Sequence, residues 1–405
     1  MNKLKIINDP IYGFVDIPNE LIFDIIQHPY FQRLRRISQM GLSFLVYPGA
    51  HHTRFHHAIG AMHLMQTALN TLKNKEVEIS PEEEEATLIA ILLHDIGHGA
   101  FSHALEYSIL NTSHETISLQ LMQKLNEEFK GKLDLAIQIF SGKYHKKFLL
   151  ELISSQIDVD RLDYLRRDSF YSGVIEGQVN SDRLIKMFNV KDNQLVIDEK
   201  GIYSVEKFII SRRLMYWQVY LHKTGMMLEK ILEKILARAV ELLSHHKPLF
   251  LDDNLRFLFE DDMQLQNNKS IEIFTLIDDS DILYHIKKWT NNQDFILSYL
   301  SKMIINRENL NKIFIQKEAF STNYIDELSA QVLEQFPIEK HDLSYLLFHG
   351  KLIHRAYNKD AHPIKLLDKN NKIIEFSEAS DQLNIQALSH PVTKYYLSYP
   401  RIKKL

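Results

Sequence analysis

The chain has 405 residues, of which 45% are hydrophobic and 25% charged, and its formal net charge is -4 at pH 7. These values indicate a globular protein of one large or two ordinary domains, with no overall signature of nucleic-acid binding. The sequence has no cysteine, which excludes disulfides, thiolate nucleophiles and cysteine-bound metal centres. It also has no apolar run long enough for a signal peptide or membrane span, so we expect a cytoplasmic protein.

The first 315 residues are predicted to be mostly helical. Residues 18–41 have apolar side chains at helical spacing, and Pro29 divides them into two helices. Ser80, Pro81 and Glu83 form a capping signal for a helix that runs to about Asp95. The same periodicity predicts helices over 55–74, 114–129 and 158–171.

Two later parts of the chain are predicted to contain strands. Residues 194–205 are predicted to form a hairpin that turns at Glu199 to Gly201, followed by one long helix from Glu206 to Ser244. Shorter helices follow over 251–307. From about residue 316, short strands are predicted at 351–358, 362–377 and 394–402. We therefore expect a mainly α fold, with a helical core in 1–315 and a small α+β region in 316–405.

Histidines concentrate in one part of the chain. Nine of the 20 lie between residues 51 and 114, and the pair His94-Asp95 ends a strongly aliphatic run. Two glycines at 97 and 99 predict the end of the helix there. The best candidates for further metal ligands are His57 and Asp160, because imidazole and carboxylate together suit Mn, Fe, Zn, Ni or Mg. Each residue alone is more often structural, and only the joint pattern indicates a metal site.

The segments "TRFHHAIG", "LLHDIGHGAFSH", "SHET" and "IDVDRLDYLRRD" resemble the HD-domain phosphohydrolase superfamily. The resemblance is closest to the deoxynucleoside triphosphate (dNTP) triphosphohydrolases, which include the mammalian SAM-and-HD-domain enzyme and bacterial relatives. It covers about residues 5–223 and is weak over the last third. It implies an HD-domain helical bundle that hydrolyses a dNTP to deoxynucleoside and inorganic triphosphate.

The resemblance also implies roles for individual residues. One divalent metal ion would be held by His57, His94, Asp95 and Asp160. Proton transfer would be assisted by His98, His114 and Glu115. Contacts with the triphosphate would come from Arg54, His103, Arg161 and Arg212. Contacts with the sugar would come from Gln39, Asp168, Tyr164 and Tyr220. The chain itself supports this, because Asp160, Tyr164 and Asp168 recur at i, i+4 and i+8 on one helical face.

Activation by a nucleotide, with an additional Mg accompanying it, is a further implication. The matching residues lie between subunits in the mammalian enzyme, so a homodimer or homotetramer is expected. They are Lys5, Asn8, Gln32, Arg35, Val46, His222 and Lys223. A plain surface network explains Gln32 and Arg35 equally well. Gln27 departs from the family, since it stands where the mammalian enzyme has a guanine-recognising aspartate.

Three alternatives remain open. His94 and His98 are spaced like the histidines of a metalloprotease helix, although Gly97 and Gly99 oppose a continuing helix. An HD-domain phosphatase or phosphodiesterase acting on another nucleotide or on nucleic acid would use the same four ligands. A non-enzymatic nucleotide sensor or nucleic-acid-binding module is disfavoured by the complete ligand set.

Overall fold

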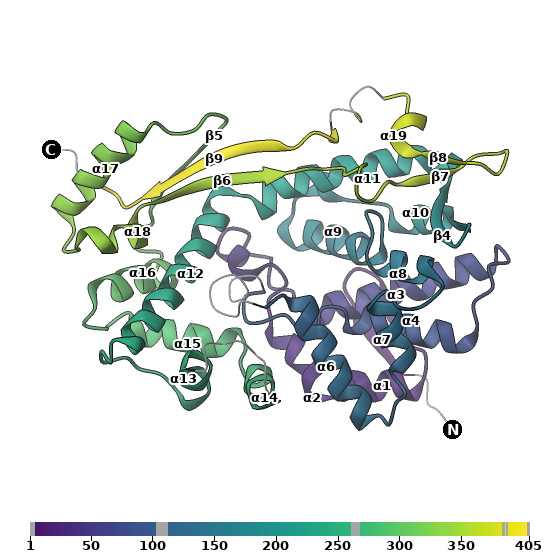
Figure 1. The fold of residues 1–405 in the computed structure, drawn as a ribbon, viewed down its shortest axis with the longest axis horizontal. Coiled ribbons are helices and arrows are strands. Elements are labelled where there is room, and N and C mark those ends of the chain that lie inside the picture. Colours follow the sequence, from purple (N-terminus) through teal and green to yellow (C-terminus); the bar gives the residue numbers. More distant parts are fainter. Residues whose placement is uncertain (1–4, 103–111, 261–267, 383–384, 386–387, 403–405) are drawn as a thin grey trace.

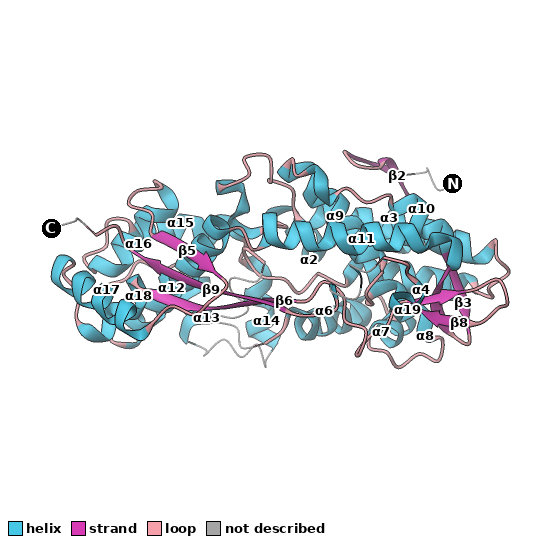
Figure 2. Cartoon of the chain, turned by 90° about the horizontal axis from the view of Figure 1, so that it is seen from above, coloured by secondary structure: helices cyan, strands magenta, loops and turns pink. Residues whose placement is uncertain are grey.

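The computed structural model describes residues 5–102, 112–260, 268–382, 385 and 388–402 as an elongated, mainly α-helical molecule (Figures 1 and 2). This confirms the predicted fold class. The longer helices have these bounds: α1 (Glu20–Gln27), α3 (Arg54–Lys73), α4 (Pro81–Leu93), α6 (His114–Glu128), α9 (Val159–Ser172), α11 (Ile202–Met215), α12 (Lys223–Ser244), α15 (Asp279–Trp289), α16 (Phe295–Ile305) and α17 (Thr322–Gln335). Shorter helices include α2 (Pro29–Gln32), α7 (Asp134–Phe140), α8 (Lys147–Ile153), α10 (Ser181–Met187), α13 (Asp253–Glu260), α14 (Asn268–Leu276), α18 (Leu343–Leu346) and α19 (Phe376–Ala379).

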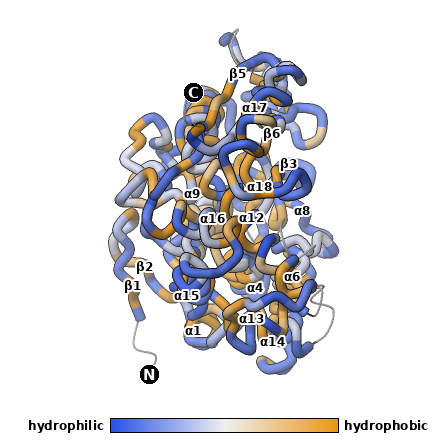
Figure 3. Tube along the Cα trace, turned by 90° about the vertical axis from the view of Figure 1, so that its left-hand side faces the viewer, coloured by the Kyte–Doolittle hydropathy of each residue, from blue (hydrophilic) through white to orange (hydrophobic). Residues whose placement is uncertain are grey.

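Helix α4 lies at the centre of the helical core. Every residue from Ala86 to Leu93 is buried, which explains why this helix is aliphatic all round. Its start follows the predicted capping box, in which Ser80 Oγ accepts from the amide of Glu83 and the Glu83 carboxylate accepts from the amide of Ser80. In Figure 3, hydrophobic segments recur along interior helices such as α12 and α16. Among the described residues, no helix has the length and apolar character needed to cross a bilayer.

Helices α3 and α9 cross closely at Gly60. A Cβ atom added there would lie 2.1 Å from Arg167 Nη2 and 2.2 Å from Asp163 Oδ1. Arg167 is fully buried and bonds Asp163 on its own helix and Asp9 in strand β1. The hairpin of β1 (Lys5–Asp9) and β2 (Gly13–Ile17), which the periodicity did not predict, is thereby fastened to the core.

Two predictions for the middle of the chain are wrong. The hairpin consists of β3 (Phe188–Lys191) and β4 (Gln194–Asp198), and it turns at Asp192 and Asn193, both of which have positive φ. Asp and Asn tolerate this left-handed conformation, which two-residue hairpin turns require. The stretch Glu199–Gly201 is instead a short 3-10 turn, η5, that leads into α11.

The predicted helix from Glu206 to Ser244 is also interrupted. After α11 the backbone widens into a π-helical turn, η6 (Tyr216–Tyr220), and α12 starts only at Lys223. Similarly, the helical pattern of residues 18–41 gives way after α2 to two 3-10 turns, η1 (Arg33–Arg36) and η2 (Gly41–Leu45). Hydrophobic periodicity does not distinguish these variants from a regular helix.

The C-terminal strands occur where they were predicted. They are β6 (Phe348–His354), β7 (Lys365–Leu367), β8 (Ile373–Glu375) and β9 (Val392–Tyr399). One sheet has the order β5-β9-β6, and β5 (Lys312–Gln316) comes from before the predicted division at residue 316. The other has the order β3-β4-β7-β8 and joins β7 to β4 of the helical part. The division into two domains stays a prediction.

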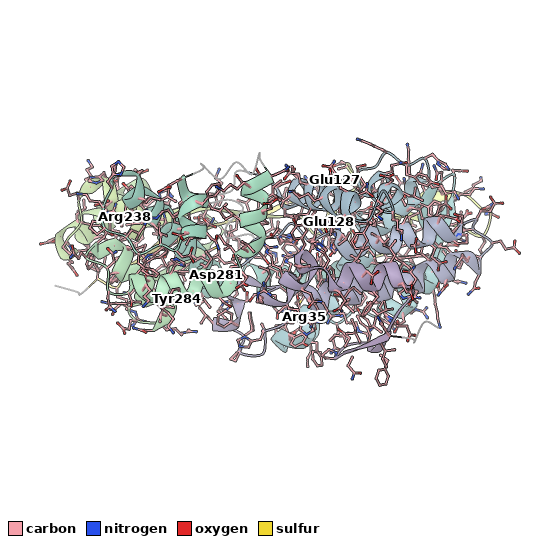
Figure 4. All side chains as sticks on the ribbon, turned by 90° about the horizontal axis from the view of Figure 1, so that it is seen from below. Arg35, Glu127, Glu128, Arg238, Asp281 and Tyr284 are labelled. Carbon is pink, nitrogen blue, oxygen red and sulfur yellow. The ribbon has the colours of Figure 1, made fainter. Side chains whose placement is uncertain are left out.

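Helix α12 packs against α16 and against the turn η2. Arg238 on this helix (Figure 4) binds Glu241, Asp294 before α16 and Asp342 before α18. The Arg238 side chain is only 12% exposed, so these three carboxylates compensate a mostly buried charge. The connection fixes the position of α12, whose other end reaches the cavity described below.

Replacing Gly60 with alanine is expected to destabilise the protein by about 1–3 kcal/mol, since the new methyl group overlaps Arg167 and Asp163. Gly225 in α12 is a matched control, because nothing lies within 4 Å of a Cβ there. Gly225→Ala should leave stability unchanged or raise it by about 0.4–1 kcal/mol. Urea unfolding followed by circular dichroism measures both, and equal midpoints would contradict the tight crossing at Gly60.

Candidate active site

Four predicted metal ligands converge from three helices. His57 lies in the first turns of α3, His94 and Asp95 follow the last residue of α4, and Asp160 lies in the first turn of α9. His57 Nε2 and His94 Nε2 lie 3.1 Å and 3.5 Å from Asp160 Oδ1. The same two nitrogens lie 3.7 Å and 3.4 Å from the Asp95 carboxylate. These residues are remote in sequence, and the packing of α3 on α4 and α9 brings them together.

The chemistry of this group fits a divalent cation. His57 Nε2 and His94 Nε2 are buried, and neither has a hydrogen bond of acceptable geometry with the described residues. Their other ring nitrogens are fixed by Asp163 Oδ2 at 2.7 Å and by the Ile91 carbonyl at 2.6 Å. Such second contacts hold an imidazole with its free nitrogen directed at a metal. Two imidazoles and two carboxylates would therefore hold the ion.

The pKa values of the histidines and aspartates in the cluster depend on one another. Burial by itself lowers the pKa of His57, but Asp160 and Asp163 outweigh it and raise that pKa to about 10. Burial raises the pKa of Asp160, but His57 and His94 bring it below its usual range. Asp160 is thus stable as an anion only beside positive charge. A bound dication would supply that charge and leave the imidazoles neutral.

A cavity of about 520 Å³ opens beside this cluster. It lies where α4, α6, α9, η2, η6 and α12 meet. The predicted site residues that line it are Gln39, Arg54, His94, Asp95, His98, His114, Glu115, Asp160, Arg161, Tyr164, Asp168 and Tyr220. His57 lies behind the wall, fully buried. The predicted face of α9 therefore points into the cavity at all three of its positions.

Two histidines stack on the wall next to Asp95. The rings of His98 and His114 lie 3.9 Å apart at an angle of 16°, and His98 Nε2 lies 3.4 Å from Asp95 Oδ1. Burial and the nearby Arg54 hold the pKa of His98 well below its usual value. Gly97 permits the approach, because a Cβ there would lie 2.3 Å from the His114 carbonyl oxygen. Glu115 Oε1 lies 3.4 Å from His114 Nε2.

Three arginines surround the same region. Arg54 binds Asp95 and donates from Nε to Ser102 Oγ at 3.0 Å. Arg161 pairs with buried Asp158, while its own Nε is buried without a hydrogen-bond partner within the described part of the chain. Arg212 does not line the cavity but lies behind Tyr216, and its Nε and Nη1 are buried and likewise unpartnered. Buried polar atoms without hydrogen bonds are costly, so the unpartnered nitrogens of Arg161 and Arg212 favour an anionic ligand.

The opposite wall is built on Asp168. One carboxylate oxygen accepts from Tyr220 Oη and the other contacts His52 Nε2, both at 2.7 Å. The His52 ring stacks on Tyr171. Tyr164 and Tyr220 meet edge to face at 6.2 Å. Gln39 lines the cavity with its Oε1 buried and unpartnered among the described residues. His103 lies outside the residues that the structure describes.

Several titratable residues of the site were not predicted to have a role there. They are His52, Asp158, Asp163, Tyr216 and Glu229. Asp163 had a detectable signal, since it follows Asp160 by three residues on the same helix. His52 belonged to the dense histidine region. Nothing local distinguished Tyr216 or Glu229, because their roles arise from the π-helical turn and the packing of α12.

The predicted allosteric residues lie away from the cavity. Lys5 and Asn8 belong to β1, and the Lys5 ammonium lies over the Phe23 ring. Gln32 donates to the Ile26 carbonyl and accepts from Arg35 (Figure 4), which also covers Phe55. The remaining three are Val46 at the end of η2, and His222 and Lys223 at the start of α12. A role in activation stays a prediction for all seven.

Replacing Asp163 with asparagine is expected to weaken metal binding by about 10–100-fold, because His57 loses the anion that orients it. Asp182→Asn is the control, since Asp182 is exposed and lies 3.7 Å from its partner Arg166. Competition with a chromogenic chelator measures the affinity, and circular dichroism verifies folding. Unchanged affinity in Asp163→Asn would contradict the orienting role.

Comparison with known proteins identifies the family. Residues 54–168 match the HD domain and residues 179–303 match the HD associated region. The Bacillus subtilis uncharacterized protein YwfO is 33% identical over 94% of this chain and 88% of its own length. The human deoxynucleoside triphosphate triphosphohydrolase SAMHD1 is 28% identical, and the match spans 59% of this chain but only 45% of that protein. A phosphohydrolase structure from Bacteroides thetaiotaomicron superposes with a TM-score of 0.94 at 48% identity, over 98% of this chain and all of that one. The chain therefore belongs to the HD-domain phosphohydrolase superfamily.

Proposed function

We propose that the protein is a metal-dependent triphosphohydrolase that cleaves a dNTP into a deoxynucleoside and inorganic triphosphate. The observation that carries the proposal is one cavity that combines the metal-ligand cluster, the cationic Arg161 wall and the Asp168–Tyr220 pair. Family membership supports a metal-dependent hydrolase. The name of the human relative supports the substrate class.

Different residues near the metal cluster contribute to different steps of the proposed hydrolysis. When bound, a divalent ion supplies Lewis-acid polarisation of a phosphoryl oxygen and of the attacking water. Water attacks the α-phosphorus, the bond to the 5′-oxygen breaks, and that oxygen takes up a proton. His98 and His114 stack at the cavity wall beside Asp95, where they can relay this proton. Glu115 contacts His114 and orients it.

The arginines match the charge of a triphosphate. Arginine forks bind phosphate oxygens by charge-assisted hydrogen bonds. Arg161 and Arg212 both keep buried nitrogen atoms without partners in the described part of the chain. Anionic oxygens in the cavity would satisfy Arg161, whereas Arg212, which lies behind Tyr216, comes within their reach only when that side chain moves aside. Arg54 is already bonded to Asp95, so its contribution is positive potential next to the metal.

The aromatic wall matches a deoxyribose. Asp168 is held by His52 and Tyr220, which leaves its remaining lone pairs to accept from a 3′-hydroxyl. Tyr164 and Tyr220 pack edge to face beside it and narrow the space for a 2′-hydroxyl. An HD-domain phosphatase or phosphodiesterase remains the second candidate, because it would use the same metal ligands. We further propose a cytoplasmic homo-oligomer in which a nucleotide, with Mg, binds near β1 and the start of α12.

Purified protein is expected to convert dNTPs to deoxynucleoside and triphosphate, and matched ribonucleotides far more slowly. A chelator should abolish activity, and one of Mn, Fe, Zn, Ni or Mg should restore it. Anion-exchange separation of the products is the measurement, with Asp160→Ala as the inactive control. Release of orthophosphate, or turnover only of monophosphates or cyclic nucleotides, would favour the second candidate. Activity only in mixtures of dNTPs would support activation by a nucleotide.

Arg212→Gln is expected to lower kcat/KM for dNTPs by about 10–100-fold, since a hydrogen bond to a charged group is lost. Arg213→Gln provides a matched control, because the neighbouring arginine has no buried unpartnered nitrogen. Steady-state kinetics with dATP measures both variants. A smaller effect for Arg212→Gln than for Arg213→Gln would exclude the phosphate contact.

A further inference from the structure

Glu229 is an acidic side chain at the cavity for which the proposed reaction has no use. It lies on α12 and lines the cavity together with Gln39 and Gly41. Gly41 has a positive φ of 51°, and a Cβ there would lie 3.6 Å from Glu229 Oε1 and 3.3 Å from the Phe101 carbonyl oxygen. The left-handed backbone at this position favours glycine, and Gly41 lies directly beside the carboxylate.

Glu229 lacks a counter-charge. Its neighbour Lys230 is bound to Glu233 at 2.8 Å, and within the described residues no cation pairs with Glu229. Burial and repulsion by Glu233 raise the pKa of Glu229 to about 7. The carboxylate is thus ionised above neutral pH at a cost in solvation. A hydrogen-bond donor on a ligand would offset that cost.

The position of Glu229 follows from the order of contacts along the cavity wall. Asp95 binds Arg54, Arg54 binds Ser102, and Ser102 Oγ also contacts the Ser38 and Gln39 carbonyl oxygens. Next in sequence comes Gly41, which lies against Phe101 and Glu229. This part of the cavity wall therefore extends from the metal-ligand cluster to the Glu229 carboxylate. If the phosphates lie at the metal and the sugar at Asp168 and Gln39, the base lies beyond Gln39 and faces Glu229.

The chemistry of this end favours particular bases. Glu229 and the unpartnered Gln39 Oε1 both present acceptors. Adenine and cytosine carry an exocyclic amino group at the ring position where guanine, thymine and uracil present a carbonyl oxygen. A carboxylate accepts from an amino group but repels a carbonyl oxygen.

We propose that Glu229 is a specificity-determining residue that accepts a hydrogen bond from the exocyclic amino group of the substrate base. It selects the substrates that have an amino group at this position, dATP and dCTP, against dGTP, dTTP and dUTP. The inference rests on the proposed function, since it takes the cavity to hold a nucleotide. Glutamine at this position keeps the shape but adds a donor, so it can bind a carbonyl oxygen.

The kinetic test compares kcat/KM for dATP, dCTP, dGTP and dTTP at pH 8.5, where the carboxylate is ionised. The wild type should prefer dATP and dCTP to dGTP and dTTP by about tenfold or more, and Glu229→Gln should remove most of that preference. Glu260→Gln is the control, because Glu260 is exposed and lies outside the cavity lining. The ratio between substrates does not depend on the fraction of folded enzyme. An unchanged ratio in Glu229→Gln, or no wild-type preference, overturns the inference.

A binding test separates this inference from the proposed reaction. Deoxyadenosine, deoxycytidine, deoxyguanosine and thymidine are titrated into metal-loaded protein by calorimetry. Tighter binding of deoxyadenosine and deoxycytidine that is lost in Glu229→Gln supports the inference even where no dNTP is hydrolysed. Hydrolysis of dNTPs with equal nucleoside affinities in both proteins refutes it and leaves the reaction intact.

Discussion

The structure depends on a buried carboxylate, Asp163. One of its oxygens contacts His57 Nδ1 at 2.7 Å, and both bind the Arg167 guanidinium at 2.9 Å. Arg167 in turn binds Asp9, so a single chain of charges connects the metal ligand, the crossing of α3 and α9, and the N-terminal hairpin. Because Asp163 and Arg167 are fully buried, removal of Arg167 would leave two carboxylates, Asp9 and Asp163, without the cation that they share. The geometry of the site and the stability of the core therefore share one interaction.

Electrostatic balance also organises the cavity. Asp95 is compensated by Arg54, Asp158 by Arg161, and Asp160 by the two imidazoles. Arg161 and Arg212 keep nitrogen atoms without partners among the described residues, whereas the far end holds the unpartnered Gln39 Oε1 and the Glu229 carboxylate. A ligand that is anionic at one end and donates hydrogen bonds at the other would complement both. A nucleotide with an amino-bearing base has this distribution.

The C-terminal sheet is connected to the site through η6. His354, at the end of β6, stacks on Tyr216 at 4.0 Å, and Lys394 of β9 lies over the Trp217 ring. Tyr216 lines the cavity and Arg212 lies behind it. Tyr216 and Tyr220 are the first and last residues of the π-helical turn, and both line the cavity. The C-terminal strands thus support a wall of the site from outside.

The sequence by itself determined the helical class, the capped start of α4 and the C-terminal strands, because each depends on local periodicity and capping chemistry. The motif spacing was enough to nominate His57, His94, Asp95 and Asp160, and these converge in the structure. Only the tertiary structure decided the break of the predicted 206–244 helix and the turn at Asp192–Asn193. It alone placed Asp163 behind His57 and Glu229 opposite Gly41, since these contacts join segments whose separation in sequence carries no periodic signal. Local sequence patterns specify helices and strands. The site is marked by buried polar and charged groups without partners, and their burial depends on which side chains the fold packs around them.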